Sequence, residues 1–132
     1  MNVLKLEDLA KIKLVKDIEK KPNEGLIEIK RLGFNLKIRE LDDYDMYDAM
    51  EEANKANDLD SSINANAFML LKGVIEPNFK DIEVQKALGE IDPIKAIKSL
   101  LTAREIGEIA LKIRDLGEKE NSIGDLDRIK GL

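Results

Sequence analysis

The spacing of apolar side chains predicts that the chain begins with an amphipathic helix over residues 7–20. Its apolar positions recur every third residue, at Leu9, Ile12, Val15 and Ile18. Charged side chains fill most of the positions between them, so one face of the helix is apolar and the other is charged. A proline and a glycine then prevent the helix from continuing, which makes residues 1–24 a helix followed by a linker.

The period of the pattern changes from three to two in residues 25–40. Apolar and polar side chains alternate from Leu26 to Arg31 and again from Leu36 to Arg39, with Gly33 between the two runs. Two alternating runs around a glycine-containing turn predict a β-hairpin. Because an isolated hairpin is only marginally stable in water, we expect it to lie on the helices or to pair with another chain.

Start and stop signals divide residues 41–117 into a series of helices that we expect to form a helical core. An Asp, Ser or Thr side chain can begin a helix, because its oxygen accepts a hydrogen bond from a free backbone N–H of the first turn. The expected caps are Asp42 or Asp43, Ser61 or Ser62, Asp92 and Thr102, and two further helical turns are expected from Asp81 to Leu88. The first of these helices runs to about residue 57, and glycine or proline ends three others, at Gly73 with Pro77, Gly89 and Gly117.

These helices differ in how much apolar surface they carry. The helix that follows Asp42 or Asp43 has four residues on one side: Met46, Tyr47, Met50 and Ala53. The next helix has the widest apolar stripe, so we expect it to be the most buried: Ile63, Ala67, Phe68, Leu70, Leu71, Val74 and Ile75. The helix that follows Asp92 has proline at its first position, a favourable start, and carries Ile94, Ile97, Leu100 and Leu101.

The clearest local signal is a capping box, in which Thr102 and Glu105 can bond to each other's backbone N–H groups. The helix that it begins carries one narrow apolar stripe, at Ile106, Ile109, Ala110, Ile113 and Leu116. Gly107 lies inside this helix, where glycine costs about 1 kcal/mol relative to alanine. Either another backbone approaches closely at this position, or the cost is simply tolerated.

Together these patterns predict an α+β fold that is mostly α, with a small β-hairpin near the N-terminus. We expect residues 1–132 to form a single compact helical domain. Residues 118–132 are polar and punctuated by glycine, with Ile123, Leu126 and Ile129 three apart. They are expected to form either a short final helix or a tail that becomes ordered on a partner.

The composition argues against most enzymatic and metal-binding classes. The chain has no cysteine and no histidine, so thiolate and imidazole chemistry and the usual zinc and iron–sulfur sites are excluded. None of its few serines has a neighbouring general base, and it has no glycine-rich phosphate loop. We therefore expect no catalytic residues, no bound metal and no cofactor.

The charge pattern and the hydropathy pattern make nucleic acid and membranes unexpected partners. The formal net charge is −5, and the two short basic pairs, at residues 20–21 and 30–31, have acidic residues nearby. Duplex binders usually carry a basic patch, because phosphate contacts supply most of their affinity. No apolar run approaches the length needed to span a bilayer, and residues 1–8 do not resemble a signal peptide.

Two acidic clusters have structural explanations that compete with metal binding. Asp42, Asp43, Asp45 and Asp48 lie at an expected helix start, where carboxylates interact favourably with the helix dipole. Asp58, Asp60 and Ser62 match the first ligands of a calcium-binding loop. Ile63 and Met69 then occupy the positions that require glycine and glutamate, so calcium binding is not expected.

Residues 73–117 contain short motifs in a characteristic order. Gly73-Val74-Ile75-Glu76-Pro77-Asn78-Phe79-Lys80-Asp81 is followed by Val84-Gln85, by the pair Leu100-Leu101 and by Glu105-Ile106. This order resembles the tail assembly chaperones of PBSX-type contractile-tailed phages, the XkdN-like family. The hairpin segment Ile29-Lys30-Arg31-Leu32-Gly33 also fits the layout of that family. Departures are Arg104, where the family often has glycine, and Val84, where it often has leucine.

The resemblance implies a non-enzymatic phage or prophage protein that acts in the cytoplasm of the host bacterium. It would bind the long helical tape measure protein, assist assembly of the tail tube protein, and be absent from the mature virion. Families of this type often make a second, longer product by ribosomal frameshifting. The competing hypotheses are a structural tail completion or head–tail connector protein and a small helical regulatory protein.

Binding or self-association needs an apolar surface, and the narrow stripe near the C-terminus is the predicted one. We predict partner contacts at Leu100, Leu101, Ile106, Ile109 and Ile113. The alternative is that these residues are ordinary core, because an amphipathic helix by default packs its apolar face inward.

Overall fold

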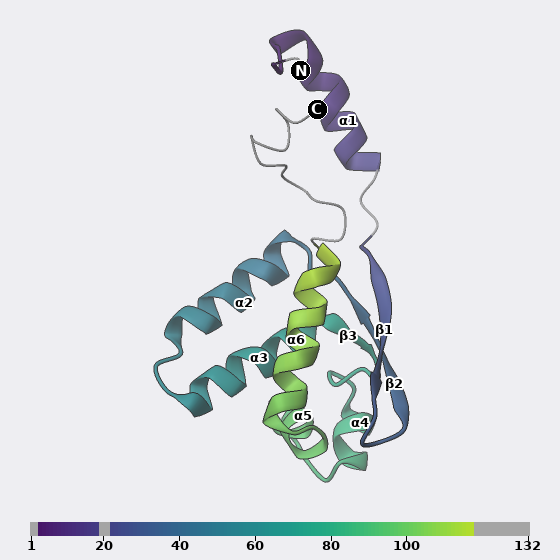
Figure 1. Ribbon diagram of the computed structural model, residues 1–132, viewed down its shortest axis with the longest axis vertical. Helices are drawn as coiled ribbons and strands as arrows, with labels where there is room; N and C mark the ends of the chain where they lie inside the picture. Colours follow the sequence, from purple (N-terminus) through teal and green to yellow (C-terminus); the bar gives the residue numbers. More distant parts are fainter. Residues whose placement is uncertain (1–2, 19–21, 118–132) are drawn as a thin grey trace.

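The computed structural model describes residues 3–18 and 22–117 and confirms the predicted mostly helical α+β fold (Figure 1). A short 3-10 turn, η1, precedes the first helix. The elements are η1 (Leu6–Asp8), α1 (Leu9–Ile18), β1 (Glu24–Ile29), β2 (Phe34–Arg39), α2 (Asp43–Lys55), α3 (Leu59–Gly73), β3 (Val74–Glu76), α4 (Ile82–Ala87), α5 (Pro93–Leu100) and α6 (Ala103–Gly117). The predicted helix or tail at 118–132 lies outside the described residues, and the single domain stays a prediction.

The hairpin formed by β1 and β2 has the predicted position, and a third strand extends it. Pairing runs from Glu24 opposite Arg39 to Ile29 opposite Phe34, with Gly33 at a φ of 71° in the turn. β3 pairs antiparallel with the other edge of β2, which gives the order β1-β2-β3. The prediction that Val74 and Ile75 continue the preceding helix was therefore wrong. The chain leaves the helix at Gly73, and the strand supplies β2 with hydrogen-bonding partners on its second edge.

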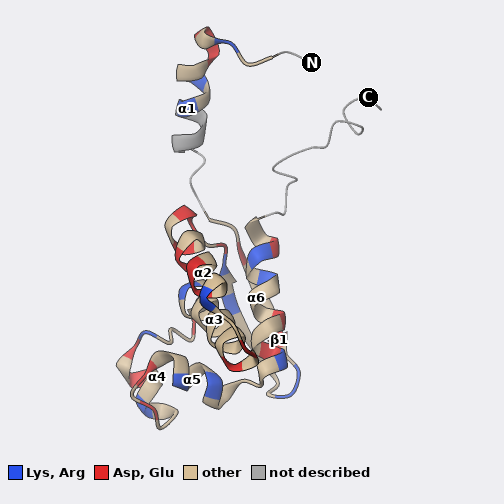
Figure 2. Cartoon of the chain, turned by 90° about the vertical axis from the view of Figure 1, so that its left-hand side faces the viewer, with Lys and Arg blue, Asp and Glu red and all other residues tan. Residues whose placement is uncertain are grey.

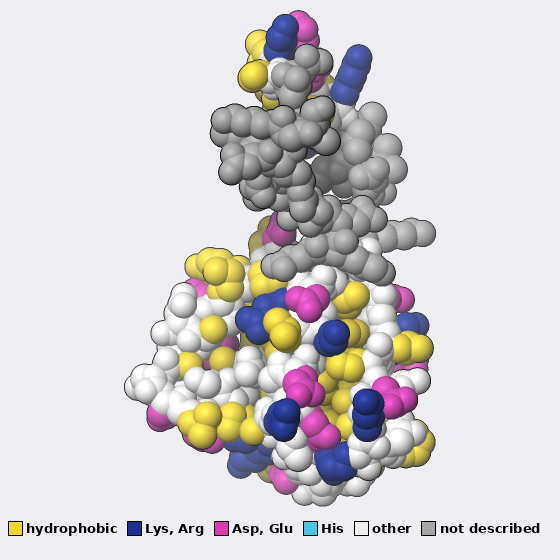
Figure 3. Space-filling model, in the orientation of Figure 1, with side chains coloured by type: hydrophobic (Ala, Val, Ile, Leu, Met, Phe, Trp, Pro, Cys, Tyr) yellow, Lys and Arg dark blue, Asp and Glu magenta, His cyan; other side chains and the backbone are white. Residues whose placement is uncertain are grey.

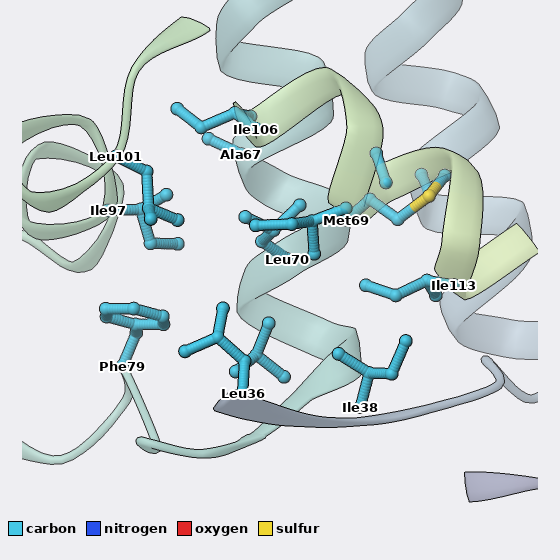
Figure 4. Close-up of a cluster of buried hydrophobic side chains, with 14 of the residues drawn as sticks. Leu36, Ile38, Ala67, Met69, Leu70, Phe79, Ile97, Leu101, Ile106 and Ile113 are labelled. Atoms are coloured by element: carbon cyan, nitrogen blue, oxygen red, sulfur yellow. The ribbon is translucent and has the colours of Figure 1, made fainter. Parts of the chain in front are cut away.

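The hydrophobic core lies where α3, α6, α5 and the sheet meet. α3 packs against α2, α5 and α6, and the sheet contacts α3 and α6. Figure 4 shows aliphatic side chains from several elements around Leu70, with the ring of Phe79 facing the same centre. Phe79 is the only one of the chain's five aromatic side chains that is buried. The core is therefore aliphatic, as the composition suggested.

Three of the four predicted helix caps are confirmed, and Asp81, predicted only as the start of two helical turns, is also a cap. Asp42, Asp81 and Asp92 each accept a backbone N–H of the first turn, and Thr102 accepts from the Glu105 N–H at 3.1 Å. α3 is the exception, because it begins before Ser61 and Ser62. Asp58 caps it, with its Oδ1 2.8 Å from the Ser61 N–H. The earlier start adds Leu59 to the helix, where its side chain is exposed.

α1 stands apart from the sheet and the other helices (Figures 1 and 2). Two of its predicted apolar positions, Leu9 and Ile12, are exposed. The side chains of the other two lie outside the described part of the chain. The N-terminal helix therefore presents apolar surface to solvent, at least over its first half.

Candidate protein-binding surfaces

The structure buries most of the residues that the sequence predicted as a partner surface. Leu101, Ile106, Ile109 and Ile113 are at most 3% exposed, and only Leu100 is partly exposed. The three isoleucines are buried because α6 turns its apolar stripe toward α3 and the sheet. Leu101, which follows α5, is part of the same core. The burial of these four residues agrees with the alternative prediction, which was that they belong to the ordinary core. Contact between any of the five and a partner stays a prediction.

The surface beside that stripe forms a groove between β1 and α6, which we call the β1–α6 groove. Two hollows of about 270 Å³ and 290 Å³ lie along it and share Ile27. Ile109 contributes to the first hollow and Leu116 to the second. Figure 3 looks onto this face and shows hydrophobic side chains lying between basic and acidic ones. The second hollow exposes mostly apolar surface, and the first exposes about as much polar as apolar surface. Apolar surface bordered by charged side chains is typical of protein-binding sites.

Along the outer edge of β1, beside this groove, backbone groups lack a hydrogen-bonding partner within residues 3–18 and 22–117. The Glu40 N–H donates to the Asn23 carbonyl at 2.8 Å, which fixes the alternation of hydrogen bonds along the antiparallel pair. By that alternation, Glu24, Leu26 and Glu28 turn their backbone N–H and C=O groups away from β2. β1 is also an edge strand of the sheet in the described residues. The groove can therefore hydrogen-bond an extended segment as well as bury apolar side chains.

An ion pair closes one end of the groove by tying the hairpin to the start of α6. Arg31 donates from Nε and Nη2 to the two carboxylate oxygens of Glu105, at 3.1 and 2.8 Å, and Nη2 also reaches the Leu100 carbonyl. Glu105 additionally accepts from the Thr102 N–H at 2.9 Å. The hydrogen bonds to Glu105 lower the pKa of its carboxyl group to about 2, and the one from Arg31 has the largest effect. The sequence predicted the capping box, but nothing local pointed to Arg31.

A second surface lies on the outer side of α2. Tyr44, Tyr47 and Met50 are exposed by 84%, 63% and 58%, whereas Ala49 is buried toward α3. The sequence placed Tyr47 and Met50 on one side of this helix, and the structure leaves both of them exposed. A row of side chains of mixed size does not by itself show which side of a helix the rest of the protein covers.

Several of the acidic residues considered as metal ligands have structural partners. Asp42 caps α2, and Asp45 contacts Arg39 at 3.0 Å and Lys72 at 3.8 Å. A backbone hydrogen bond from Ser61 to the capping Asp58 lowers the pKa of that carboxyl group. No group of three or more potential metal-ligating side chains occurs within residues 3–18 and 22–117.

Within residues 3–18 and 22–117, no backbone of another element approaches Gly107 closely. An added Cβ would find only the Asn66 side-chain nitrogen, at 3.9 Å, among the described residues. That distance is an ordinary contact, so the first explanation offered for this glycine was wrong. Every helix within residues 3–18 and 22–117 is too short or too polar to span a bilayer.

These features define a small α+β protein whose distinctive surfaces are an apolar groove along a free strand edge and an aromatic helix face. The model of the phage XkdN-like tail assembly chaperone family matches residues 12–130. The chain belongs to this family. No curated protein and no solved structure matches it.

Proposed function

We propose that this chain binds the tape measure protein as a non-enzymatic chaperone and assists assembly of the tail tube around it. Membership of the tail assembly chaperone family supports the general role. The observation that carries the proposal is the β1–α6 groove, which combines apolar surface with the outer edge of β1, an edge strand within the described residues. The protein would act in the host cytoplasm and leave before the virion is complete.

The proposed client explains why exposed apolar surface is useful in this protein. A long helical protein that is not yet surrounded by its tube has apolar stripes in contact with water, and these favour aggregation. A chaperone that covers such stripes with an apolar groove and a charged rim keeps the client soluble. Its own dense mixed charge, 22 basic and 27 acidic residues, favours solubility of the complex.

Co-expression tests the proposal directly. A tape measure protein from the same gene cluster should be mostly insoluble alone and mostly soluble when this chain is co-expressed. Ile27→Ala in the shared wall of the two hollows should reduce the soluble fraction. Ile94→Ala is the matched control, since Ile94 is also partly buried against the core but lies outside both hollows. A client that stays insoluble beside well-folded wild-type chaperone would contradict the proposal.

The competing role as a permanent tail or connector component makes a different prediction. A structural component remains in purified particles, whereas the proposed chaperone is absent from them. Mass spectrometry of assembled tails distinguishes the two, with the tail tube protein as the internal standard. Detection of this chain at a fixed ratio to the tube protein would replace the chaperone role with a structural one.

A further inference from the structure

Both tyrosines of the chain lie on the solvent side of α2. Tyr44 and Tyr47 are three residues apart, so their rings are neighbours on the helix surface, and Met50 continues the row by another three residues. α2 packs on α3 through its other side, where Ala49 is buried. Core packing therefore does not account for this row. Tyrosine and methionine are enriched at protein interfaces, because each offers a large contact area.

The charges around the row are negative. Asp43, Asp48 and Glu51 are exposed beside it, and Figure 2 shows acidic segments along α2 on the side facing the viewer. The single basic residue of α2, Lys55, lies in its last turn, 3.6 Å from Glu52. The surface thus combines aromatic side chains with a local excess of negative charge.

We propose that this surface, the tyrosine face of α2, docks a client helix whose apolar stripe is bordered by lysine or arginine. The tyrosine face consists of Tyr44, Tyr47 and Met50 with Asp43, Asp48 and Glu51. The inference rests on the proposed chaperone function and adds the chemistry of the client segment.

Charge complementarity selects this occupant over a neutral or acidic helix. Basic side chains on both sides of an apolar stripe reach Asp48 and Glu51 while the stripe covers the tyrosine rings. The faces of those rings also attract cations directly. α2 has 13 residues and is about 20 Å long, so it can contact three to four turns of a parallel or antiparallel helix.

Peptide binding to the full chain provides the test. The probes are two helical peptides of about 20 residues with the same leucine stripe, one flanked by lysine and the other by glutamate. We expect calorimetry to show binding of the lysine peptide and much weaker binding of the glutamate peptide. The double substitution Tyr44→Ser and Tyr47→Ser should weaken lysine-peptide binding by about tenfold or more, since tyrosines at an interface centre often dominate affinity. Leu111→Ser, an exposed leucine on α6, is the control and should change little.

Charge reversal keeps the inference testable if the tyrosine variant folds poorly. Asp48→Lys with Glu51→Lys should invert the preference, so that the glutamate peptide binds more tightly than the lysine peptide. Raising the salt concentration to 1 M should reduce the preference in both proteins, because the screening length falls to about 3 Å. Equal binding of the two peptides by the wild-type chain, or unchanged binding by the tyrosine variant, would overturn the inference.

A second copy of this chain is the other occupant that the test can reveal. Its α1 carries exposed Leu9 and Ile12 with Lys11 and Lys13 between and beside them. Sedimentation can show self-association that the tyrosine substitutions abolish and with which the lysine peptide does not compete. In that case the tyrosine face is a contact between copies of this chain, and the client-helix inference is wrong.

Failure of this inference and failure of the proposed function have different signatures. If the tyrosine variant keeps the tape measure protein as soluble as the wild type does, the inference falls and the chaperone function stands. If even the wild-type chain leaves the tape measure protein insoluble, the proposed function falls, whatever the peptides show.

Discussion

Gly73 illustrates how one residue lets two helices approach each other. A Cβ at this position would lie 2.6 Å from Cδ1 and 2.9 Å from Cγ2 of Ile113, a fully buried side chain of α6. Gly73→Ala should therefore lower the free energy of unfolding by about 1–3 kcal/mol, the usual cost of overpacking. Urea denaturation at neutral pH measures the change.

The same substitution at Gly107 should have the opposite effect on stability. Gly107 lies in α6, with only an ordinary contact to Asn66 at the position that a Cβ would take. Gly107→Ala should raise the free energy of unfolding by about 0.5–1 kcal/mol, because alanine restricts the unfolded chain and favours the helix. A loss of stability in this variant, or none in Gly73→Ala, would contradict the packing described.

At the scale of elements, the contact between the hairpin and α6 should make stability depend on acid pH. The pKa of Glu105 is about 2 in the folded protein and 4.5 without its partners. Because the folded value is the lower one, the stabilisation is present above about pH 4.5 and is lost as the pH falls toward 2. Glu105→Gln should cost up to about 1 kcal/mol at pH 7, because it removes the charge of the ion pair, which solvent already weakens at the half-exposed Arg31. The capping box should survive, since a glutamine oxygen can still accept from the Thr102 N–H.

Urea unfolding at pH 7 and pH 2.5 measures this effect. The wild-type protein should lose more stability between the two values than Glu105→Gln does. Glu108→Gln removes an exposed carboxylate from the same helix and serves as the control. Parallel losses in the wild type and Glu105→Gln would show that the pair with Arg31 does not stabilise the fold.

Elements could be predicted from the sequence where local chemistry decides them. The caps at Asp42, Asp92 and Thr102 depend on residues a few positions away, so the sequence carried the necessary information. β3 was missed because three residues that follow a helical stripe form a strand only when β2 is available to pair with them. The pair formed by Arg31 and Glu105 spans 74 positions, and no local pattern could reveal it.

The candidate surfaces were harder to predict than the fold for the same reason. An apolar stripe shows that a helix has a preferred side, but it does not show whether the chain itself or another protein covers that side. The stripe of α6 turned out to be core, whereas Tyr47 and Met50 of α2 turned out to be surface. Only the arrangement of neighbouring elements distinguishes the two outcomes.

At the scale of the whole molecule, Phe79 connects the sheet side of the core to α5. Its ring is fully buried, and the side-chain amide of Gln85 donates a hydrogen bond to the backbone carbonyl oxygen of Phe79 at 2.9 Å. Phe79→Ala should cost about 3–5 kcal/mol, a large share of the stability of a protein of this size, and should lower the melting temperature by more than about 10 °C. Phe34→Ala removes an exposed ring from the hairpin and should change the melting temperature little. Thermal circular dichroism compares the two variants.

The position of the tyrosines also makes the chain its own optical probe. It has no tryptophan, so its near-ultraviolet emission comes almost entirely from the two phenol rings on α2. Since these rings are in water already, unfolding should change their signal only slightly. A protein or peptide that covers them should shift it strongly, and association can thus be followed without attaching any dye.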